Sequence, residues 1–303
     1  MSDNFDEWLA GREEEPRTDD GILSPGTVVG NYTIVALLGS GGFADVYRAK
    51  TAKGRKVAIK ILHRLDEKSR RRFEREAEIL SQVWHPNFPK LLGFGMCGER
   101  PYLVTELLRH YQLPGSDRRI ARFLRQIISA VSALHRAGYV HRDIKPANVL
   151  AREDGTPVLI DFGLVCPVSS VKRKKDGLSV EEGQSVGVGT AGYSAPEQFT
   201  GAEVGPEADI HALGMLIKEC FSKKLPRCWQ RIYLTATNSD PSVRYHSAAE
   251  LKQAIIWRHS RKYWLAGAIV ALILAAVGLT VWLKSAENIQ ENIENSTFEA
   301  DTL

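Results

Sequence analysis

The sequence predicts an α+β fold with two lobes, a β-rich first half and a helical second half, and one membrane-spanning helix near the C-terminus. Three observations lead to this expectation. Short runs rich in β-branched residues alternate with Gly and Lys over residues 32–60. Apolar residues recur at helical spacing over residues 118–136, and residues 264–283 carry no charge.

Residues 32–60 are expected to form three antiparallel strands joined by tight turns, with Lys53-Gly54 as the second turn. A helix follows, because apolar residues recur at positions i, i+4 and i+7 until His85-Pro86 ends the pattern. Those apolar positions are Phe73, Ala77 and Leu80.

Residues 91–94 and 102–107 are expected to add further strands. The clearest helix of the first 260 residues covers residues 118–136, and Gly138 occupies the place of a helix C-cap. Short strands, a long polar loop and more helices are expected up to about Ile256. The apolar stripe of the helix consists of Ile120, Phe123, Leu124, Ile127, Val131 and Leu134.

The composition is that of an ordinary globular protein, with 44% hydrophobic and 25% charged residues among 303. The net charge of +4 is small and no basic stripe is interleaved with aromatic residues, so we expect no nucleic-acid partner. Residues 1–30, which begin with eight acidic and two basic residues among the first 20, are expected to form an acidic, flexible arm without a signal peptide. The four cysteines lack metal-ligand spacing and are expected to be reduced thiols.

Residues 264–283 are expected to cross a membrane, since twenty helical residues extend about 30 Å, the thickness of the hydrocarbon core. The alternative is a buried core helix, but a core helix of this length normally carries a polar stripe. Trp264 and Trp282 flank the segment like interfacial aromatic residues. The basic segment 258–263 precedes it and the short acidic tail 284–303 follows it. By the positive-inside rule the N-terminal domain is cytoplasmic, at the inner or plasma membrane, and the tail lies outside.

Small residues recur every four positions in this segment, at Gly267, Ala271 and Ala275. Such a stripe lets two membrane helices pack closely, so a homodimer is a hypothesis. The simpler interpretation is that Ala and Gly are common in membrane helices.

A glycine-rich turn, Leu38-Gly39-Ser40-Gly41-Gly42-Phe43-Ala44-Asp45-Val46, lies between two predicted strands. Glycines let a backbone approach phosphates and present its N–H groups, although most such turns are ordinary hairpins. The run Val57-Ala58-Ile59-Lys60 ends an apolar strand with a lysine. If that ammonium group faces inward it needs an anion, and Glu76 on the next helix is a suitable partner.

A stronger motif is the run Tyr139-Val140-His141-Arg142-Asp143-Ile144-Lys145-Pro146-Ala147-Asn148-Val149-Leu150, followed by Asp161-Phe162-Gly163. The spacing of Asp143, Lys145 and Asn148 supplies a base, a cation and an oxygen ligand within one loop. Asp161 would arrive on a neighbouring strand and complete an oxygen site for Mg²⁺. Phosphoryl transfer needs these parts, because it depends on positioning and charge neutralisation.

With Ala195-Pro196-Glu197 after them, these motifs resemble the protein kinase family, and more closely the bacterial membrane-anchored Ser/Thr protein kinases. The resemblance covers residues 32–256. It implies a bilobal protein kinase fold, with the kinase domain at residues 31–257. It also implies transfer of the ATP γ-phosphate to protein Ser and Thr hydroxyls in membrane-associated signalling, with ATP and Mg²⁺, or Mn²⁺, as cofactors.

The resemblance implies a role for each residue of the catalytic motifs. Asp143 would accept the proton of the substrate hydroxyl, and Lys145 would lie near the γ-phosphate. Asn148 and Asp161 would bind Mg²⁺.

The resemblance also implies how ATP is held. Lys60 would contact the α- and β-phosphates and pair with Glu76. Thr105 would be the gatekeeper, and Glu106 and Leu108 would meet the adenine at the hinge. The ATP site would further include Ala58 and the run from Leu38 to Val46.

Three scaffold residues follow from the same resemblance: Glu197 would pair with Arg244, and Asp209 would tie down the catalytic loop. Two departures from the family pattern concern binding. Ala44 replaces the third glycine of the phosphate loop, so we expect weakened but surviving ATP binding. The chain between Asp209 and Arg244 is short, so the helix that many kinases use for substrate docking looks reduced or missing.

A third departure is the long segment between Asp161 and Glu197. With Arg142 before Asp143, the chain resembles kinases whose activation loop is ordered by phosphorylation, because a phosphate can pair with that arginine. Autophosphorylation is therefore expected between residues 179 and 190. The alternative is a loop that is merely flexible and solvated. The candidate acceptors are Ser179, Ser185 and Thr190, although Thr190 also resembles the family's structural threonine near the catalytic aspartate.

The main alternative to an active enzyme is a pseudokinase that serves as a nucleotide-binding scaffold. Ala44 and the reduced helical lobe favour this alternative, whereas the joint presence of Lys60, Asp143, Asn148 and Asp161 favours an enzyme. A kinase of small molecules is a third hypothesis, which the Ala-Pro-Glu motif disfavours.

Overall fold

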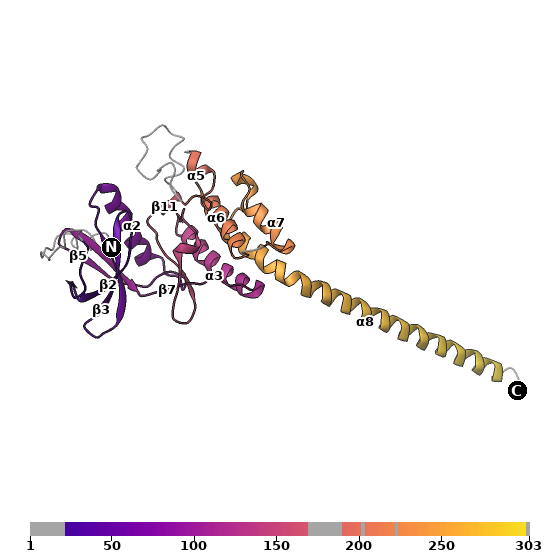
Figure 1. The fold of residues 1–303 in the computed structure, drawn as a ribbon. Coiled ribbons are helices and arrows are strands. Elements are labelled where there is room, and N and C mark those ends of the chain that lie inside the picture. The colour runs from indigo at the N-terminus through magenta and orange to yellow at the C-terminus, as the bar shows by residue number, and fades with distance from the viewer. Residues whose placement is uncertain (1–21, 169–189, 201–203, 222–223, 301–303) are drawn as a thin grey trace. The chain divides into compact units, whose positions relative to one another are not determined.

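The computed structural model describes residues 22–168, 190–200, 204–221 and 224–300 (Figure 1). The chain divides into two compact units, Met1–Gln253 and Ala254–Leu303. The first unit carries the sheet and helices that surround the sequence motifs, and the second is helical.

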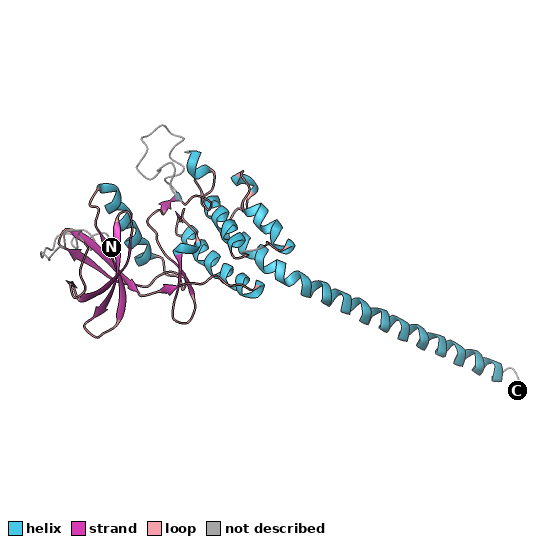
Figure 2. Ribbon diagram, in the orientation of Figure 1, coloured by secondary structure: helices cyan, strands magenta, loops and turns pink. Residues whose placement is uncertain are grey.

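A six-stranded antiparallel sheet forms the first lobe, as the sequence predicts (Figure 2). The strand order is β1-β2-β3-β4-β6-β5. The turn between β3 and β4 contains Lys53-Gly54, and Gly54 has a φ of +76°, which a residue without a Cβ adopts at little cost. The strands are β1 (Val28–Val29), β2 (Tyr32–Ser40), β3 (Ala44–Thr51), β4 (Lys56–Leu62), β5 (Leu91–Cys97) and β6 (Arg100–Glu106).

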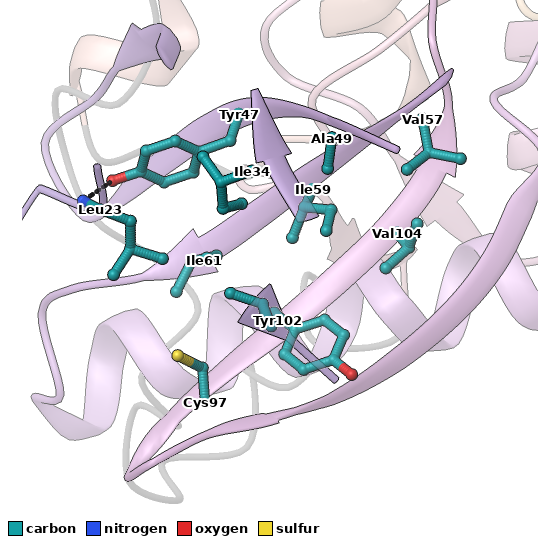
Figure 3. Packing of buried hydrophobic residues seen from close by; sticks show 11 residues of the cluster. Leu23, Ile34, Tyr47, Ala49, Val57, Ile59, Ile61, Cys97, Tyr102 and Val104 are labelled. Atoms are coloured by element: carbon teal, nitrogen blue, oxygen red, sulfur yellow. Dashed lines mark hydrogen bonds between the residues drawn. The ribbon is translucent and has the colours of Figure 1, made fainter. Parts of the chain in front are cut away.

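Alternating apolar residues of these strands form one core, shown in Figure 3. Leu23 and Val29 belong to it, and the backbone N–H of Leu23 donates to the hydroxyl of Tyr47 at 3.2 Å. The expected arm at residues 1–30 is therefore wrong for residues 22–30, which are ordered on the sheet. Burial of two large aliphatic side chains outweighs the Gly- and Pro-rich composition of this stretch.

Helix α2 (Glu67–Gln82) confirms the first predicted helix. Asp66 caps its N-terminus by accepting from the backbone N–H of Ser69 at 3.0 Å. Phe73 and Ala77 are buried on its inner face, which packs against β4 and β5. The helix ends at Gln82 and is capped by Val83, two residues before the predicted stop at His85.

A second, three-stranded sheet with the order β10-β9-β7 begins the second lobe. Its strands are β7 (Arg109–His110), β9 (Val149–Ala151) and β10 (Pro157–Leu159). Only Leu107 and Leu108 separate β6 from β7, so the link between the two sheets is two residues long. The sequence pattern did not predict β7, because a two-residue strand carries no periodicity.

The helical part of the lobe is built around α3 (Asp117–Arg136), whose apolar stripe is buried as predicted. Gly138 follows with a φ of +84°. Trp229 is fully buried and its indole N–H donates to Asp117 at 2.5 Å, which ties a later helix to the start of α3. The other α-helices here are α5 (Glu197–Thr200), α6 (Pro206–Glu219) and α7 (Arg227–Ala236).

Helix α8 (Ala248–Ala300) runs through the predicted basic segment, the apolar segment and much of the tail without a break. The sequence between these bounds contains no proline, and Pro is the residue that most strongly interrupts a helix. Residues 267–285 form one helical stretch that is long and apolar enough to cross a membrane by length and composition. Its large apolar side chains, such as Leu272 and Leu274, are exposed.

Gly214 of α6 provides a test of the packing between α6 and α7. A Cβ at this position would lie 2.6 Å from the Thr237 methyl group and 2.9 Å from the Ala236 Cβ. We expect Gly214→Ala to lower the free energy of unfolding by about 1–3 kcal/mol, because the two helices must move apart. Thermal unfolding of the full chain in detergent measures this. Gly115→Ala is the control, since a Cβ there meets no atom within 4 Å, and an equal loss in both variants would contradict the prediction.

Candidate active site

The glycine-rich turn joins β2 and β3, and residues 41–43 form its tip. The Gly41 N–H donates to the Ala44 carbonyl at 3.0 Å, so the turn closes on itself. Asp45 is buried and accepts from the hydroxyl of Ser40 at 2.5 Å. Its side chain therefore stabilises the hairpin, a contact that the sequence did not predict. The Phe43 ring extends back toward β4, with its centroid 5.2 Å from the Lys60 ammonium group.

Lys60 and Glu76 form the ion pair that the sequence predicted. Lys60 Nζ lies 2.5 Å from Glu76 Oε2 and 3.8 Å from Asp161 Oδ1. Burial acts to lower the pKa of Lys60, but the charges of Glu76 and Asp161 outweigh it and raise that pKa. The ammonium group therefore stays charged. Through these contacts Lys60 of β4 is close to both Glu76 of α2 and Asp161.

Asp143, Lys145 and Thr190 form a closed triangle of hydrogen bonds. Lys145 Nζ donates to Asp143 Oδ2 at 2.8 Å and to Thr190 Oγ1 at 2.6 Å, and Thr190 Oγ1 donates to Asp143 Oδ1 at 2.8 Å. Asn148 completes the cluster, because its amide Nδ2 donates to the Asp143 carbonyl at 2.8 Å and to Oδ2 at 2.9 Å. The Asp143 carboxylate is thus oriented by three side chains from two segments.

A buried carboxylate holds the backbone of this loop in place. Asp209 of α6 is fully buried, and its oxygens accept from the backbone N–H groups of His141 and Arg142, each at 2.8 Å. His135 Nε2 lies 2.8 Å from the same carboxylate. Burial acts to raise the pKa of Asp209, but the hydrogen bond and charge of His135 and the bonds from the loop outweigh it and lower the pKa.

Two non-glycine residues of the site adopt left-handed backbone conformations. Arg142 has a φ of +71° and Asp161 a φ of +66°. Such conformations cost on the order of 1–3 kcal/mol and persist only where the surroundings fix them. Asp209 fixes the first by accepting the Arg142 N–H. At the second, the Gly163 N–H donates to Asp161 Oδ1 at 3.3 Å.

Phe162 connects the site to the core of the lobe. Its ring is fully buried, lies edge-on to Phe88 at 5.1 Å and lies 5.4 Å from the His141 ring. Three residues later, the Val165 carbonyl accepts from Arg75 of α2 at 3.0 Å. The segment after Asp161 is therefore attached to the loop of His141 and Asp143 on one side and to α2 on the other.

The residues expected to meet the adenine lie on neighbouring strands and the two-residue link. Ala58 of β4 pairs in register with Thr105 of β6, and Leu108 lies in the link. The Glu106 side chain binds Arg152, with the Nη2–Oε1 distance at 2.7 Å. Arg152 was not among the predicted site residues, because no motif or periodicity marks it.

The donor set fits a hard divalent cation such as Mg²⁺. The contacts of Asn148 described above use its amide Nδ2, so its carbonyl oxygen is not needed to hold the loop. The Asp161 side chain is 41% exposed. Besides Oδ1, which faces Lys60 and the Gly163 N–H, it carries a second carboxylate oxygen, Oδ2. Oxygen ligands of this kind suit Mg²⁺. Among the described residues no group of three or more His, Cys, Asp or Glu could hold a metal. Asn148 and Asp161 therefore offer only part of a coordination shell.

The remaining expected residues are distributed as follows. Glu197 and Arg244, expected to pair, form two contacts at 2.6 and 2.9 Å in a buried position. Thr190 lies at Asp143, whereas Ser179 and Ser185 fall outside the described residues. The described chain between α6 and Arg244 holds one α-helix, α7.

Comparison with known proteins finds relatives of the part of the chain that contains these motifs. A sequence model of the protein kinase domain matches residues 32–259. The DNA damage-responsive serine/threonine-protein kinase RqkA of Deinococcus radiodurans is 38% identical over 210 residues, 64% of this chain and 30% of RqkA. Serine/threonine-protein kinase D of Synechocystis is 32% identical over 267 residues, 75% of this chain and 52% of its own length. The chain thus spans about a third to a half of these curated relatives.

Asp209 provides a test of how the catalytic loop is held. In Asp209→Asn, the amide NH₂ faces N–H donors, so we expect the free energy of unfolding to fall by about 1–3 kcal/mol at pH 7. Because the folded-state pKa of Asp209 is lowered, the stabilisation is complete above the usual aspartate range. It is lost as pH falls below about 4 and through the folded-state pKa. The difference in free energy of unfolding between wild type and Asp209→Asn should therefore become smaller only at acidic pH.

Thermal unfolding of the full chain across this pH range measures that difference. The control is Asp154→Asn, an exposed aspartate whose carboxylate accepts from the Thr156 N–H at 2.8 Å. A difference for Asp209→Asn no larger than that of the control at pH 7 would contradict the role assigned to the buried carboxylate.

Proposed function

We propose that this chain, which belongs to the protein kinase family, is a protein-serine/threonine kinase like the relatives it resembles, and that it transfers the γ-phosphate of ATP through Asp143 and Lys60. Its catalytic domain is proposed to lie on the cytoplasmic side of a membrane. The observation that carries the chemical part is the hydrogen-bonded cluster at Asp143. Lys145, Thr190 and Asn148 converge on that carboxylate within 2.9 Å.

Asp143 is the proposed base. Its side chain is 7% exposed and its two oxygens are oriented by a cation, a hydroxyl and an amide. An acceptor Ser or Thr hydroxyl that reaches it would be aligned toward the phosphate and would give its proton to the carboxylate. Phosphoryl transfer has a loose transition state, so alignment contributes more than basicity.

Lys145 and Lys60 are the proposed phosphate contacts. Lys145 already lies beside the proposed base, where its ammonium group can neutralise charge on the transferred group. Lys60 is held by Glu76 at a fixed position in the site, with Asp161 3.8 Å away. A preorganised cation stabilises developing charge without having to reorganise during the reaction.

Asn148 and Asp161 are the proposed ligands of Mg²⁺, each through an oxygen. The metal, when bound, supplies positive charge that neutralises the phosphates. The link residues 106–108, with Ala58 and Thr105, are proposed to bind the adenine. The glycine-rich turn from Leu38 to Val46 is proposed to cover the phosphates through its backbone N–H groups.

The segment before Thr190 is proposed to carry the regulatory phosphorylation. Thr190 already donates to Asp143 and accepts from Lys145, which supports a structural role for its hydroxyl. Ser179 and Ser185 remain the candidate acceptors. A phosphate on either could pair with Arg142, which directly precedes Asp143.

The apolar stretch of α8 is proposed to anchor the protein as a single membrane span. Its length of 19 residues and the exposure of its large apolar side chains support this proposal. The bases before it and the acidic residues after it support a cytoplasmic catalytic domain. The small-residue stripe at Gly267, Ala271 and Ala275 makes a homodimer through this segment a further hypothesis.

Transfer from labelled ATP with Mg²⁺ tests the catalytic proposal. The full chain in detergent should label itself or a general protein substrate. Asp143→Asn should reduce the rate about 10²–10⁴-fold, because the acceptor proton loses its base. Lys60→Met should reduce it by a comparable factor, because the phosphates lose a fixed cation. Phosphopeptide mapping of the labelled protein should find the acceptor between residues 179 and 190.

Matched controls separate chemistry from folding. Lys56→Met changes an exposed lysine of the same strand, and Asp154→Asn changes an exposed aspartate, so both should keep the wild-type rate. A wild type that binds ATP but transfers nothing would overturn the proposal and favour the nucleotide-binding scaffold.

Membrane anchoring is tested by washing cell membranes with alkaline carbonate. We expect the wild-type chain to stay with the membrane. Leu274→Arg with Val277→Arg should release it, since each arginine at the centre of a span costs about 2.5–3.5 kcal/mol. Leu283→Arg with Ser285→Arg adds the same charge at the end of the segment and should not release it. Release of all three proteins, or of none, would contradict a membrane span.

A further inference from the structure

The guanidinium group of Arg152 joins three segments that are distant in sequence. Arg152 follows β9, and its backbone is fixed in the β9–β10 turn, where its N–H donates to the Thr156 carbonyl at 3.0 Å. Its side chain reaches Glu106 at the end of β6 and the loop that follows α2. The sheet of the first lobe is thereby attached to the hairpin of the second.

The contacts use the whole fork of the guanidinium group. Nε donates to both Glu106 oxygens, at 3.1 and 3.0 Å, and Nη2 donates to Oε1 at 2.7 Å. Nη2 also donates to the Phe88 carbonyl at 2.9 Å, and Nη1 donates to the Pro86 carbonyl. A lysine could not reproduce this pattern, because its single ammonium group has no planar fork.

Glu106 is held from the other side as well. Its carboxylate accepts from the backbone N–H of Lys90 at 2.9 Å, and its own backbone N–H donates to the Lys90 carbonyl at 3.1 Å. Burial acts to raise the pKa of Glu106, but the bonds and charges of Arg152 and Lys90 lower it. Glu106 is therefore ionised at neutral pH and paired with Arg152.

This pair differs in kind from the nearest surface pair. The side chains of Arg152 and Glu106 are 18% and 16% exposed, whereas those of Arg109 and Glu153 are 65% and 83% exposed. Exposed pairs contribute little, while a shielded bidentate pair with further bonds fixes geometry. Arg152 and Glu153 are adjacent in the β9–β10 turn, and their partners lie on either side of the two-residue link, which makes the second pair a matched control.

The position of the pair matters because the link between the sheets is only Leu107 and Leu108. Glu106 ends the strand before the link, and β7, directly after it, pairs with β9 through Arg109 and Ala151. Arg152 directly follows Ala151, so both ends of the link are tied to the same hairpin.

We propose that Arg152 is a positioning residue for the adenine end of the ATP site, acting through Glu106 to fix the backbone of residues 106–108. The proposal rests on the proposed function, since it assigns these residues to the base of ATP. Base recognition by backbone groups requires that those groups keep their place when the base is absent. Loss of Arg152 therefore weakens binding of ATP and its preference over GTP, and affects the transfer step less.

The first experiment compares wild type and Arg152→Met as full chains in detergent. Calorimetry measures the affinity for ADP, and steady-state kinetics measures KM for ATP. We expect the Kd for ADP and the KM for ATP each to rise about fivefold to tenfold, the equivalent of about one hydrogen bond. The rate at saturating ATP should fall by less than about twofold, and the preference for ATP over GTP should shrink. Unchanged nucleotide affinity, or a lower saturating rate at unchanged KM, would overturn the proposal.

A second set of variants separates positioning from stability. Arg152→Met alone leaves the Glu106 carboxylate without its main partner and should lower the melting temperature. Arg152→Met with Glu106→Leu removes both charges and should recover much of that stability, because no buried ion is left unpaired. Nucleotide affinity should nevertheless remain weak, since the link is no longer tied to Arg152. Recovery of affinity together with stability would assign Arg152 a structural role only.

Two further measurements complete the test. Arg152→Lys should restore only part of the affinity, and Arg109→Met should match wild type in affinity and in base preference. Because binding is measured directly, a wild type that binds ADP but transfers no phosphate would refute the proposed function and leave the test of Arg152 intact. A wild type that binds no nucleotide would overturn both.

Discussion

The buried carboxylate of Asp209 is the contact on which the rest of the site depends. It lies on α6, yet it accepts the backbone N–H groups of His141 and Arg142 and pairs with His135 of α3. These bonds hold Arg142 at a positive φ, and that conformation directs the next residue, Asp143, toward Lys145 and Thr190. Without this acceptor the strained backbone would relax and the cluster at Asp143 would lose its alignment.

Ion pairs that are buried or largely shielded from solvent also join separate elements elsewhere in the first unit. Lys60 pairs with Glu76, Arg152 with Glu106 and Arg244 with Glu197, and in each case the partners come from different elements. A buried pair adds little net stability, because desolvation offsets the attraction. Its value lies in geometry, since a misplaced partner would leave an unpaired buried charge. The pairs therefore specify how elements meet, while the apolar core supplies the stability.

The two sheets and α2 meet around the proposed nucleotide site through several short connections. Phe162 packs on Phe88 and His141, Arg75 binds the Val165 carbonyl, and Arg152 binds Glu106. Together they attach the segment after Asp161 to α2 and the end of β6 to the β9–β10 hairpin. Each of these contacts lies next to residues that are proposed to bind ATP or Mg²⁺.

Much of this protein follows from local sequence. The glycine-rich turn, the helix around Phe73 and Ala77, the helix over residues 118–136 and the apolar stretch near the C-terminus were all predictable, because periodicity and turn residues act within a few positions. The motifs at Asp143 and Asp161 likewise indicated the chemistry. Tertiary structure alone decided that Leu23 and Val29 join the core, that β7 pairs with β9 and that Arg152 meets Glu106. Those contacts join residues up to 46 positions apart, and no local pattern encodes which distant partner a buried group will find.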